Sequence, residues 1–510
     1  MIKTFFQYLF KLERHSSRKV FFWQFVPSLI IVILVMVSLQ FTSHLVFFKE
    51  IKDFVVDNLM YWHSDFEPTL ANGQPMQRMA LIAIDDNSYR DWGFPVITPH
   101  DKLQALIEKA VQGGANVIAV DLEIAWANEG YVRTDAQLPL SPTDQTLADY
   151  LHKLNESNTV PPIILTGMYR NPLENNIVNG EAWLEKVPSF LDRVLKAEKN
   201  VFWASSLFDI DEDRFWRRGQ LTPLVCENGH LTLVPSLALL TALAQLHMTD
   251  SETQSARQAI RDLKMRLNHW TKQFACDIEL EGKKTLAQLV SKAGMTPAFS
   301  KVQMPDFTVT LPQKGGINDK SHLINLIADE EAARIIYRFA PPEPSSSETK
   351  RQVFIKIYSA VDVLAYDIID FKDKIVFIGT THQDNCDRHP IPIRELIDVD
   401  GVYIVANATD TLLRFGQVQS QSQRNKMITS IFLVIFMVVS FTCFNIFRAS
   451  LFSTVLLVIL SVWAYYQLYQ GIITDIALYS LALQICQTVI KIVFVFFKPY
   501  QNGETEKNAN

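Results

Sequence analysis

Long apolar runs stand at the two ends of this chain, and shorter apolar runs alternate with amphipathic segments between them. Residues 21–41 contain no charged side chain, and about 20 such residues are enough to cross a bilayer as a helix. Three further runs occupy residues 427–447, 451–469 and 475–497. The pattern therefore predicts four transmembrane helices, one before and three after a large segment at 42–424.

Charge predicts the orientation of these helices. Residues 1–20 are rich in lysine and arginine, and Arg448 falls between the second and third runs. Because basic residues favour the cytoplasmic side, both chain ends are expected in the cytoplasm, including a short tail at 498–510. The first run has no small-residue cleavage site, so it is expected to stay as an anchor. We expect a multi-pass protein of the bacterial inner membrane, with residues 42–424 in the periplasm.

The large segment has the pattern of a layered α/β fold. Apolar runs that resemble strands alternate with amphipathic runs that resemble helices, which indicates βαβ units. The predicted fold class is α/β, with a mostly parallel sheet and helices on both faces. The predicted strands are 79–84, 116–122, 161–167, 200–207, 334–339 and 374–379. The predicted helices are 99–112, 141–154, 235–246, 359–365 and 401–415.

Two stretches interrupt this alternation. Residues 250–330 are expected to form an insertion that begins with a long surface helix at 251–274, and 341–352 has the composition of a linker.

Composition narrows the function classes. The chain has 510 residues, room for about three domains, and its net charge of −6 does not favour nucleic acid as a partner. The large segment contains only Cys226, Cys276 and Cys386, so at most one internal disulfide can form. Its core must come from hydrophobic burial. The chain contains none of the common catalytic signatures, so we expect no enzymatic activity and no cofactor.

Acidic residues follow several predicted strands. Asp85 and Asp86 end one strand, Asp121 and Glu123 end the next, and Asp387 lies in the loop after the last. In an open parallel sheet the ligand crevice lies at the carboxyl ends of the strands. If these strands are neighbours, the acids form a pocket for a cation, an amine or a hydroxyl-rich ligand. The alternative is that each aspartate only caps the following helix.

A second acidic stretch is FDIDEDRFWRR at 208–218. Its spacing of aspartates resembles the start of a calcium loop, but the glycine and closing glutamate of an EF-hand are missing. An ion-paired turn is the favoured interpretation, and no metal is assigned.

Six ordered blocks together resemble one family. They are ALIAIDDNSYRDWGFP, GANVIAVDLEI, FDIDEDRFWRR, VPSLALLTA, a block from YSAVDVLA to DRHPIP, and DGVYIVANATDTLL. The chain resembles the CHASE domain of the second type, an extracellular sensory domain associated with cyclases and histidine kinases. The resemblance implies one helix before the sensor and three after it. Family members usually continue into a cytoplasmic output domain, which this chain is expected to lack.

The resemblance also implies functional positions, which add to those at the strand ends. It places Asp85, Ser88, Asp121, Asp211, Arg218 and Asp387 on the family's motif positions. The combined ligand-binding candidates are Asp85, Asp86, Ser88, Asp121, Glu123, Asp211, Arg218 and Asp387.

The expected function is a membrane sensor whose periplasmic domain binds a small molecule or ion. It would signal through its helices to a separate cytoplasmic partner, and a homodimer is compatible with this role. The alternatives are an accessory or scaffold subunit of an envelope complex and a metal-dependent periplasmic hydrolase.

Overall fold

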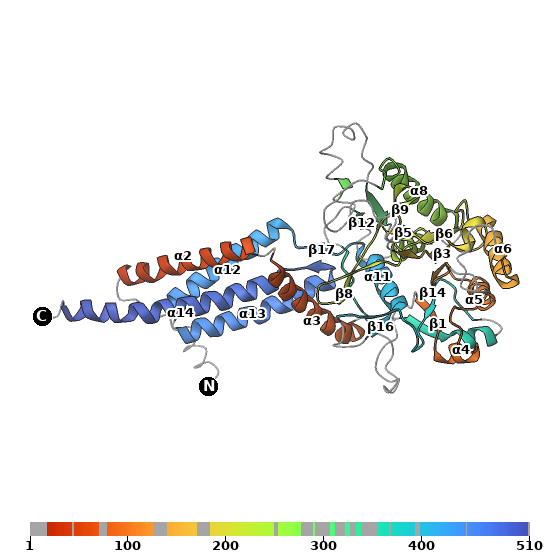
Figure 1. Ribbon diagram of the computed structural model, residues 1–510. Coiled ribbons are helices and arrows are strands. Elements are labelled where there is room, and N and C mark those ends of the chain that lie inside the picture. The colour runs from red at the N-terminus through yellow and green to blue at the C-terminus, as the bar shows by residue number, and fades with distance from the viewer. Residues whose placement is uncertain are drawn as a thin grey trace. The chain divides into compact units, whose positions relative to one another are not determined.

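The computed structural model describes most of the chain and divides it into two compact units. The large unit spans 64–418, and the helical unit combines 1–63 with 419–510 (Figure 1). The described residues are 18–42, 45–70, 79–125, 140–170, 184–248, 253–276, 289–290, 307–311, 322–326, 333–338, 355–366, 369–392, 398–444 and 446–507. The predicted linker at 341–352 lies outside them.

A six-stranded sheet forms the centre of the large unit, in the order β13-β1-β14-β2-β3-β6. All five pairings between its strands are parallel, which confirms the predicted α/β class. The strands are β1 (Met79–Ile84), β2 (Val117–Asp121), β3 (Ile163–Thr166), β6 (Val201–Ala204), β13 (Ile355–Ser359) and β14 (Ile375–Thr380).

Helices cover both faces of this sheet, as predicted. Side chains of β1 alternate between two cores, with Leu81 on one face and Ile82 on the other. Because both faces are covered, every residue of β1 is buried, which explains its continuous apolar run. One face carries α4 (Asp86–Asp91), α5 (His100–Gln112), α6 (Pro142–Glu156), α10 (Ala360–Ala365) and the 3-10 helix η2 (Phe190–Arg193). The other carries α7 (Leu237–His247), α8 (Thr253–Thr271) and α11 (Gly401–Phe415).

Several short strands were not predicted, because elements of two to four residues leave almost no periodic signal. A second sheet has the order β10-β9-β5-β4. Its strands are β4 (Tyr169–Arg170), β5 (Glu185–Lys186), β9 (Leu224–Glu227) and β10 (His230–Leu233). The remaining pairs are β7 (Phe208–Ile210) with β8 (Trp216–Gly219), β11 (Thr308–Leu311) with β12 (His322–Asn325), and β15 (Arg388–Pro390) with β16 (Asp398–Asp400).

One predicted strand is wrong, and one strand of the six-stranded sheet was not predicted. Residues 335–338 are buried or partly buried but form no strand ladder. Their backbone donors bind elsewhere: Ile336 N–H reaches Thr411 Oγ1, and Arg338 N–H reaches Asn407 Oδ1, both on α11. The missed strand is β13, at the edge of the sheet, where Lys356 interrupts the apolar run.

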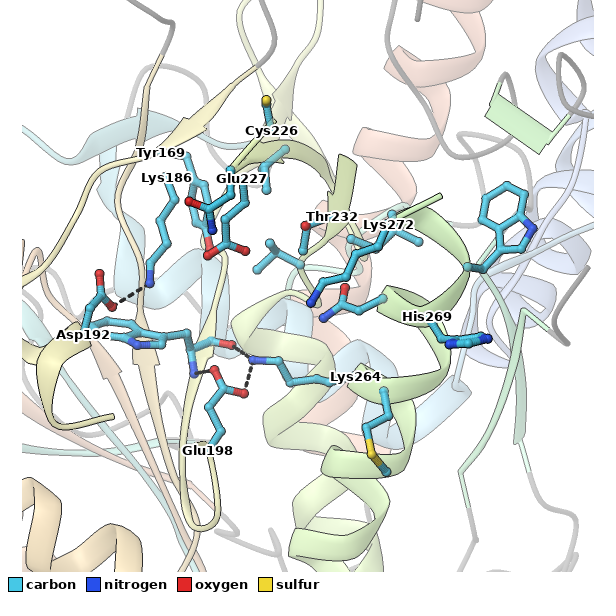
Figure 2. Close-up of a pocket in the computed structure, with 18 of the residues that line it drawn as sticks. Tyr169, Lys186, Asp192, Glu198, Cys226, Glu227, Thr232, Lys264, His269 and Lys272 are labelled. Atoms are coloured by element: carbon cyan, nitrogen blue, oxygen red, sulfur yellow. Dashed lines mark hydrogen bonds and ion pairs between the residues drawn. The ribbon is translucent and has the colours of Figure 1, made fainter. Parts of the chain in front are cut away.

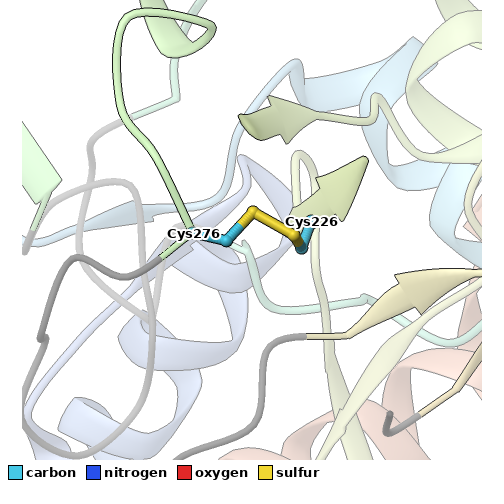
Figure 3. Close-up of a disulfide and its surroundings, with 2 residues drawn as sticks. All are labelled: Cys226 and Cys276. Atoms are coloured by element: carbon cyan, nitrogen blue, oxygen red, sulfur yellow. A yellow bond between two sulfur atoms is a disulfide. The ribbon is translucent and has the colours of Figure 1, made fainter. Parts of the chain in front are cut away.

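One disulfide joins Cys226 on β9 to Cys276 after α8 (Figure 3). Cys386 is free and exposed. This agrees with the predicted limit of one internal disulfide. The long helix predicted at 251–274 is confirmed as α8, and its apolar residues join the core around α7. The boundaries proposed for the insertion at 250–330 stay a prediction.

The helical unit contains α2 (Arg18–Thr42), the first part of α3 (Val46–Leu70), α12 (Gln423–Cys443), α13 (Ile446–Tyr469) and α14 (Ile476–Lys507), with the short strands β17 (Gln419–Ser420) and β18 (Ile472–Ile473). Helix α2 packs against α12 and α14. Within the described residues, two helices are long and apolar enough to cross a membrane, Gln423–Cys443 and Arg448–Tyr469. The other two predicted spans are helical, in α2 and α14, but the prediction of four transmembrane helices is not confirmed.

We predict that Gly379→Ala lowers the free energy of unfolding by about 1–3 kcal/mol. Gly379 lies on β14, and a Cβ there would meet the Val402 side chain of α11 at 2.7 Å. Urea unfolding of the full chain in detergent, followed by tryptophan fluorescence, measures the change. Gly219→Ala is the matched control, because its Cβ would find ordinary contact at 3.6 Å from the Phe208 ring. Equal losses in both variants would contradict a tight contact between β14 and α11.

Candidate functional site

The candidate site lies where three adjacent strands end. Strand β14 pairs with β1 on one side and with β2 on the other. Because all three are parallel, Asp85, Asp121 and the loop after β14 lie at the same edge of the sheet, where the carboxyl ends of the strands meet. We call this the strand edge. The condition set by the sequence, that these strands are neighbours, is met.

Asp85 has a structural role at the strand edge. Its Oδ1 accepts hydrogen bonds from Ser88 N–H at 2.9 Å, Ser88 Oγ at 2.7 Å and Ser359 Oγ at 2.9 Å. Ser88 is buried, and its Oγ also accepts a bond from Val361 N–H at 3.0 Å. Asp85 is therefore the N-cap of α4 and ties α4 to the β13–α10 junction, as the capping alternative expects.

Asp86 and Glu123 contribute differently. Asp86 Oδ1 accepts a hydrogen bond of 2.8 Å from Gln383 N–H, which fixes the loop after β14 to α4. Glu123 is exposed, two residues beyond the end of β2.

A group of carboxylates converges at the start of α11. Burial and the nearby carboxylate of Asp387 raise the pKa of Asp121 to about 7, against a hydrogen bond from Thr166 that lowers it. Burial also raises the pKa of Asp400 to about 6, against the lowering effects of Arg388 and Asn385 and with a further rise from Asp387. We call Asp121, Asp387 and Asp400 the carboxylate cluster. Two of its members hold protons more tightly than ordinary aspartates.

Backbone geometry makes room for this cluster. A Cβ on Gly401, the first residue of α11, would lie 2.0 Å from Asp387 Oδ2, so only glycine lets this carboxylate lie against the helix. Gly401 N–H also donates to the Asp387 carbonyl oxygen at 2.9 Å. Asp400, the N-cap residue, is 6% exposed, and its Oδ1 has no hydrogen-bond donor within the described residues. Arg388 Nε lies 3.6 Å from that oxygen.

Aromatic stacking links the cluster to the β7–β8 hairpin. Asp387 Oδ1 lies 2.7 Å from His389 Nε2, and the His389 ring stacks on Trp216 of β8 at 3.6 Å between centroids.

Asp211 and Arg218 are not part of the cluster. Arg218 Nη1 donates to both oxygens of Asp211 at 2.6 Å, and Arg217 pairs with Asp211 and Asp213. Arg217 and Arg218 are 3% and 1% exposed, so these aspartates balance buried positive charge. The ion-paired turn predicted for 208–218 is confirmed.

No metal centre is found in the described parts of the chain, where no group of three or more His, Cys, Asp or Glu side chains is arranged to hold a metal ion.

Sequence reasoning missed Asp400, Ser359 and Thr166. Asp400 stands directly before Gly401 at the start of an amphipathic helix, a signal for an N-terminal residue. Ser359 and Thr166 carry no comparable signal, because their roles depend on which strands pair.

A separate cavity of about 1750 Å³ lies between α8 and the second sheet (Figure 2). None of the predicted site residues lines it.

We predict that Asp121→Asn flattens the pH dependence of stability. A carboxyl whose pKa is raised on folding stabilises the native state below about pH 4, and this contribution is lost as the pH rises through about 7. In the wild type this carboxyl's contribution to the free energy of unfolding falls by about 4 kcal/mol over that range, and in Asp121→Asn this fall is absent. Urea unfolding of the full chain at a series of pH values measures both. Asp149→Asn, at an exposed carboxylate, should leave the wild-type slope unchanged. If the curves of unfolding free energy against pH were parallel for Asp121→Asn and the wild type, the raised pKa of Asp121 would be refuted.

A different result is expected at Asp85. Asp85→Ala removes the acceptor of three hydrogen bonds and should cost about 2 kcal/mol in unfolding free energy. Asp85→Asn keeps an oxygen in the same place and should recover most of that loss. If alanine and asparagine behave alike in the same urea assay, the cap is not what Asp85 provides.

Comparison with known proteins agrees with this architecture. The sequence model of the CHASE2 domain matches residues 29–444, which is most of the chain and includes the strand edge. No curated protein and no solved structure matches the chain. The chain therefore belongs to the CHASE2 domain family, a family of extracellular sensory domains.

Proposed function

We propose that this protein is a multi-pass sensor of the bacterial inner membrane, with its large unit in the periplasm and both chain ends in the cytoplasm. Membership of a sensory family supports the role, and the two apolar helices support the membrane location. In this proposal α2 and α14 cross the membrane together with α12 and α13. Lysine and arginine before residue 21 and Arg448 then lie on the cytoplasmic side.

The proposed input is a change of charge at the carboxylate cluster, made by a proton or a small cationic ligand. The observation that carries this proposal is the convergence of Asp121, Asp387 and Asp400 at the first turn of α11. Such carboxylates repel one another when ionised, and a proton or cation relieves that repulsion. The pKa of about 7 at Asp121 places the change close to neutral pH.

The chain connects this input directly to the helical unit. Helix α11 begins at the cluster and ends at Phe415, and α12 begins eight positions later at Gln423. Strand β1, which leads to Asp85, follows α3 along the chain. Inside the helical unit, Asp475 pairs with Lys426 of α12 at 2.7 Å and with Lys52 of α3 at 3.5 Å. These ion pairs join the helices that receive both connections.

The proposed output is a change in the arrangement of these helices, recognised by a separate cytoplasmic partner or by a second copy of the chain. A stimulus shifts such an equilibrium only by its different affinity for the two states. No enzymatic turnover is proposed. The alternative is an accessory subunit of an envelope complex, which is favoured by the structural roles of Asp85 and Asp211.

The test is hydrogen exchange of the full chain in lipid nanodiscs at pH 5.5 and pH 8, with rates corrected for the intrinsic effect of pH. We expect protection factors in α11 and the first turn of α12 to differ by about tenfold between the two states, the equivalent of about 1.4 kcal/mol of coupling. Asp121→Asn should lose the difference, and Asp149→Asn should keep it.

Two results would contradict the sensor proposal. A wild type without any pH-dependent change at α12 would favour the accessory role. A change that persists in Asp121→Asn would place the input outside the carboxylate cluster.

A further inference from the structure

A charge-divided groove lies away from the strand edge, in the 1750 Å³ cavity between α8 and the second sheet. Figure 2 shows side chains of α8 facing side chains that come from β5, η2 and β9. One wall is mainly basic and is formed by Arg261, Lys264 and Arg266 of α8 and by Lys272 in the turn directly after it, with Asp262 of α8 also lining it. The opposite side carries the acids Glu185, Asp192, Glu198 and Glu227, together with Lys196 and with Lys186, which pairs with Asp192 at 2.7 Å.

The base of the groove is the outer edge of β6. Trp203 N–H donates to Glu198 Oε1 at 3.1 Å, and Trp203 C=O accepts from Lys264 Nζ at 2.8 Å. Glu198 and Lys264 also pair with each other at 2.5 Å (Figure 2). A carboxylate and an ammonium group therefore satisfy the exposed backbone of an edge strand, which would otherwise attract another strand.

Other charges in the groove are not compensated. Within the described residues, Glu185, Glu227 and Lys272 have no ion-pair partner. After burial, the carboxylate of Glu227 is the largest cause of a raised pKa at Tyr169, which shows that this wall carries a negative potential. The Trp203 indole lines the groove at 7% exposure, and its Nε1–H has no hydrogen-bond partner in the described part of the chain.

The two walls are fixed relative to each other. The disulfide between Cys226, which lines the groove, and Cys276 joins β9 to the turn after α8 (Figure 3). Leu231 N–H donates to the Phe274 carbonyl at 2.9 Å beside it. A groove held in this way is preformed, so a ligand does not have to order its walls.

We propose that this groove binds a short zwitterionic peptide, with its ammonium group toward Glu185 and Glu227 and its carboxylate toward Lys272 in the turn after α8. A simple anion would be repelled by the acidic wall, and a simple cation by α8, whereas a ligand with both charges is attracted at both ends. Typical small-molecule pockets hold about 300–1,000 Å³, so this volume suits a ligand of several residues. This site is independent of the carboxylate cluster.

The test is isothermal titration of the full chain in detergent at low salt with tetra-alanine. Blocking either terminus, as N-acetyl-tetra-alanine or tetra-alanine amide, should weaken binding about tenfold, the effect of one charge-assisted hydrogen bond. In Glu185→Gln/Glu227→Gln, acetylation should no longer matter. In Lys272→Gln, amidation should no longer matter. Asp121→Asn should bind free tetra-alanine, the two singly blocked forms and a fourth form blocked at both ends like the wild type, which separates this groove from the strand edge.

The fourth form, blocked at both ends, is the critical control. If it binds as tightly as free tetra-alanine, or if no peptide binds at millimolar concentration, the proposal is overturned. If Lys272→Gln, and not the glutamate double variant, abolished the effect of N-acetylation on affinity, the proposed orientation of the peptide would be overturned.

Discussion

Strand β14 lies between β1 and β2, and the arrangement of the strand edge depends on that position. The two flanking strands come early in the chain, whereas β14 is formed by residues 375–380. Without it, the ends of β1 and β2 would not be joined by a continuous sheet. Gly379 then allows α11 to approach closely, because any side chain there would collide with Val402. One central strand therefore brings together the aspartate after β1, the aspartate that ends β2 and the first turn of α11.

The acids around this edge differ in what balances their charge. Asp85 accepts three hydrogen bonds and Asp211 binds a buried arginine, so each has close polar partners. Asp121 and Asp400 lie near another carboxylate and lose water without full compensation, and the pKa of each rises. Aspartate thus stabilises the fold at Asp85 and Asp211, whereas Asp121 and Asp400 lie close to a like charge.

The sequence was a good guide to what local patterns encode. Uninterrupted apolar runs identified β1, β2 and β14, because strands covered on both faces need no polar residues. The helices predicted at 141–154 and 235–246 correspond to α6 and α7. The strand predicted at 334–339 is not formed in its described part, 334–338. Arg334 and Ile335 make only an isolated contact with β8, and the N–H groups of Ile336 and Arg338 donate to side chains of α11, although Ile335 and Tyr337 are as buried as strand residues. Apolar periodicity reports burial and not the hydrogen-bond partner.

The candidate site was predictable in position but not in detail. In an open parallel sheet the ligand crevice lies at the carboxyl ends of the strands, and this rule correctly placed Asp85 and Asp121 at the same end of the sheet. It could not separate a cap from a titrating carboxyl, because that difference depends on Ser359 and Asp387, both more than 250 residues from their partners. The groove beside α8 had no sequence signal at all. Glu185 and Glu227 lie on strands of two and four residues, Asp192 lies in a short 3-10 helix, and α8 has the pattern of an ordinary amphipathic helix.

The large unit therefore contains two electrostatic arrangements of opposite design. At the strand edge, Asp387 lies against Gly401 close to two further carboxylates, and in the proposed function a proton or cation that neutralises them shifts α11. In the groove, opposite charges face each other across walls joined by a disulfide and by the Glu198–Lys264 pair. Such a site can discriminate between ligands but has little freedom to move. In our two proposals these properties belong to different parts of the same sheet, response to the carboxyl ends of β1, β14 and β2 and recognition to the edge strand β6.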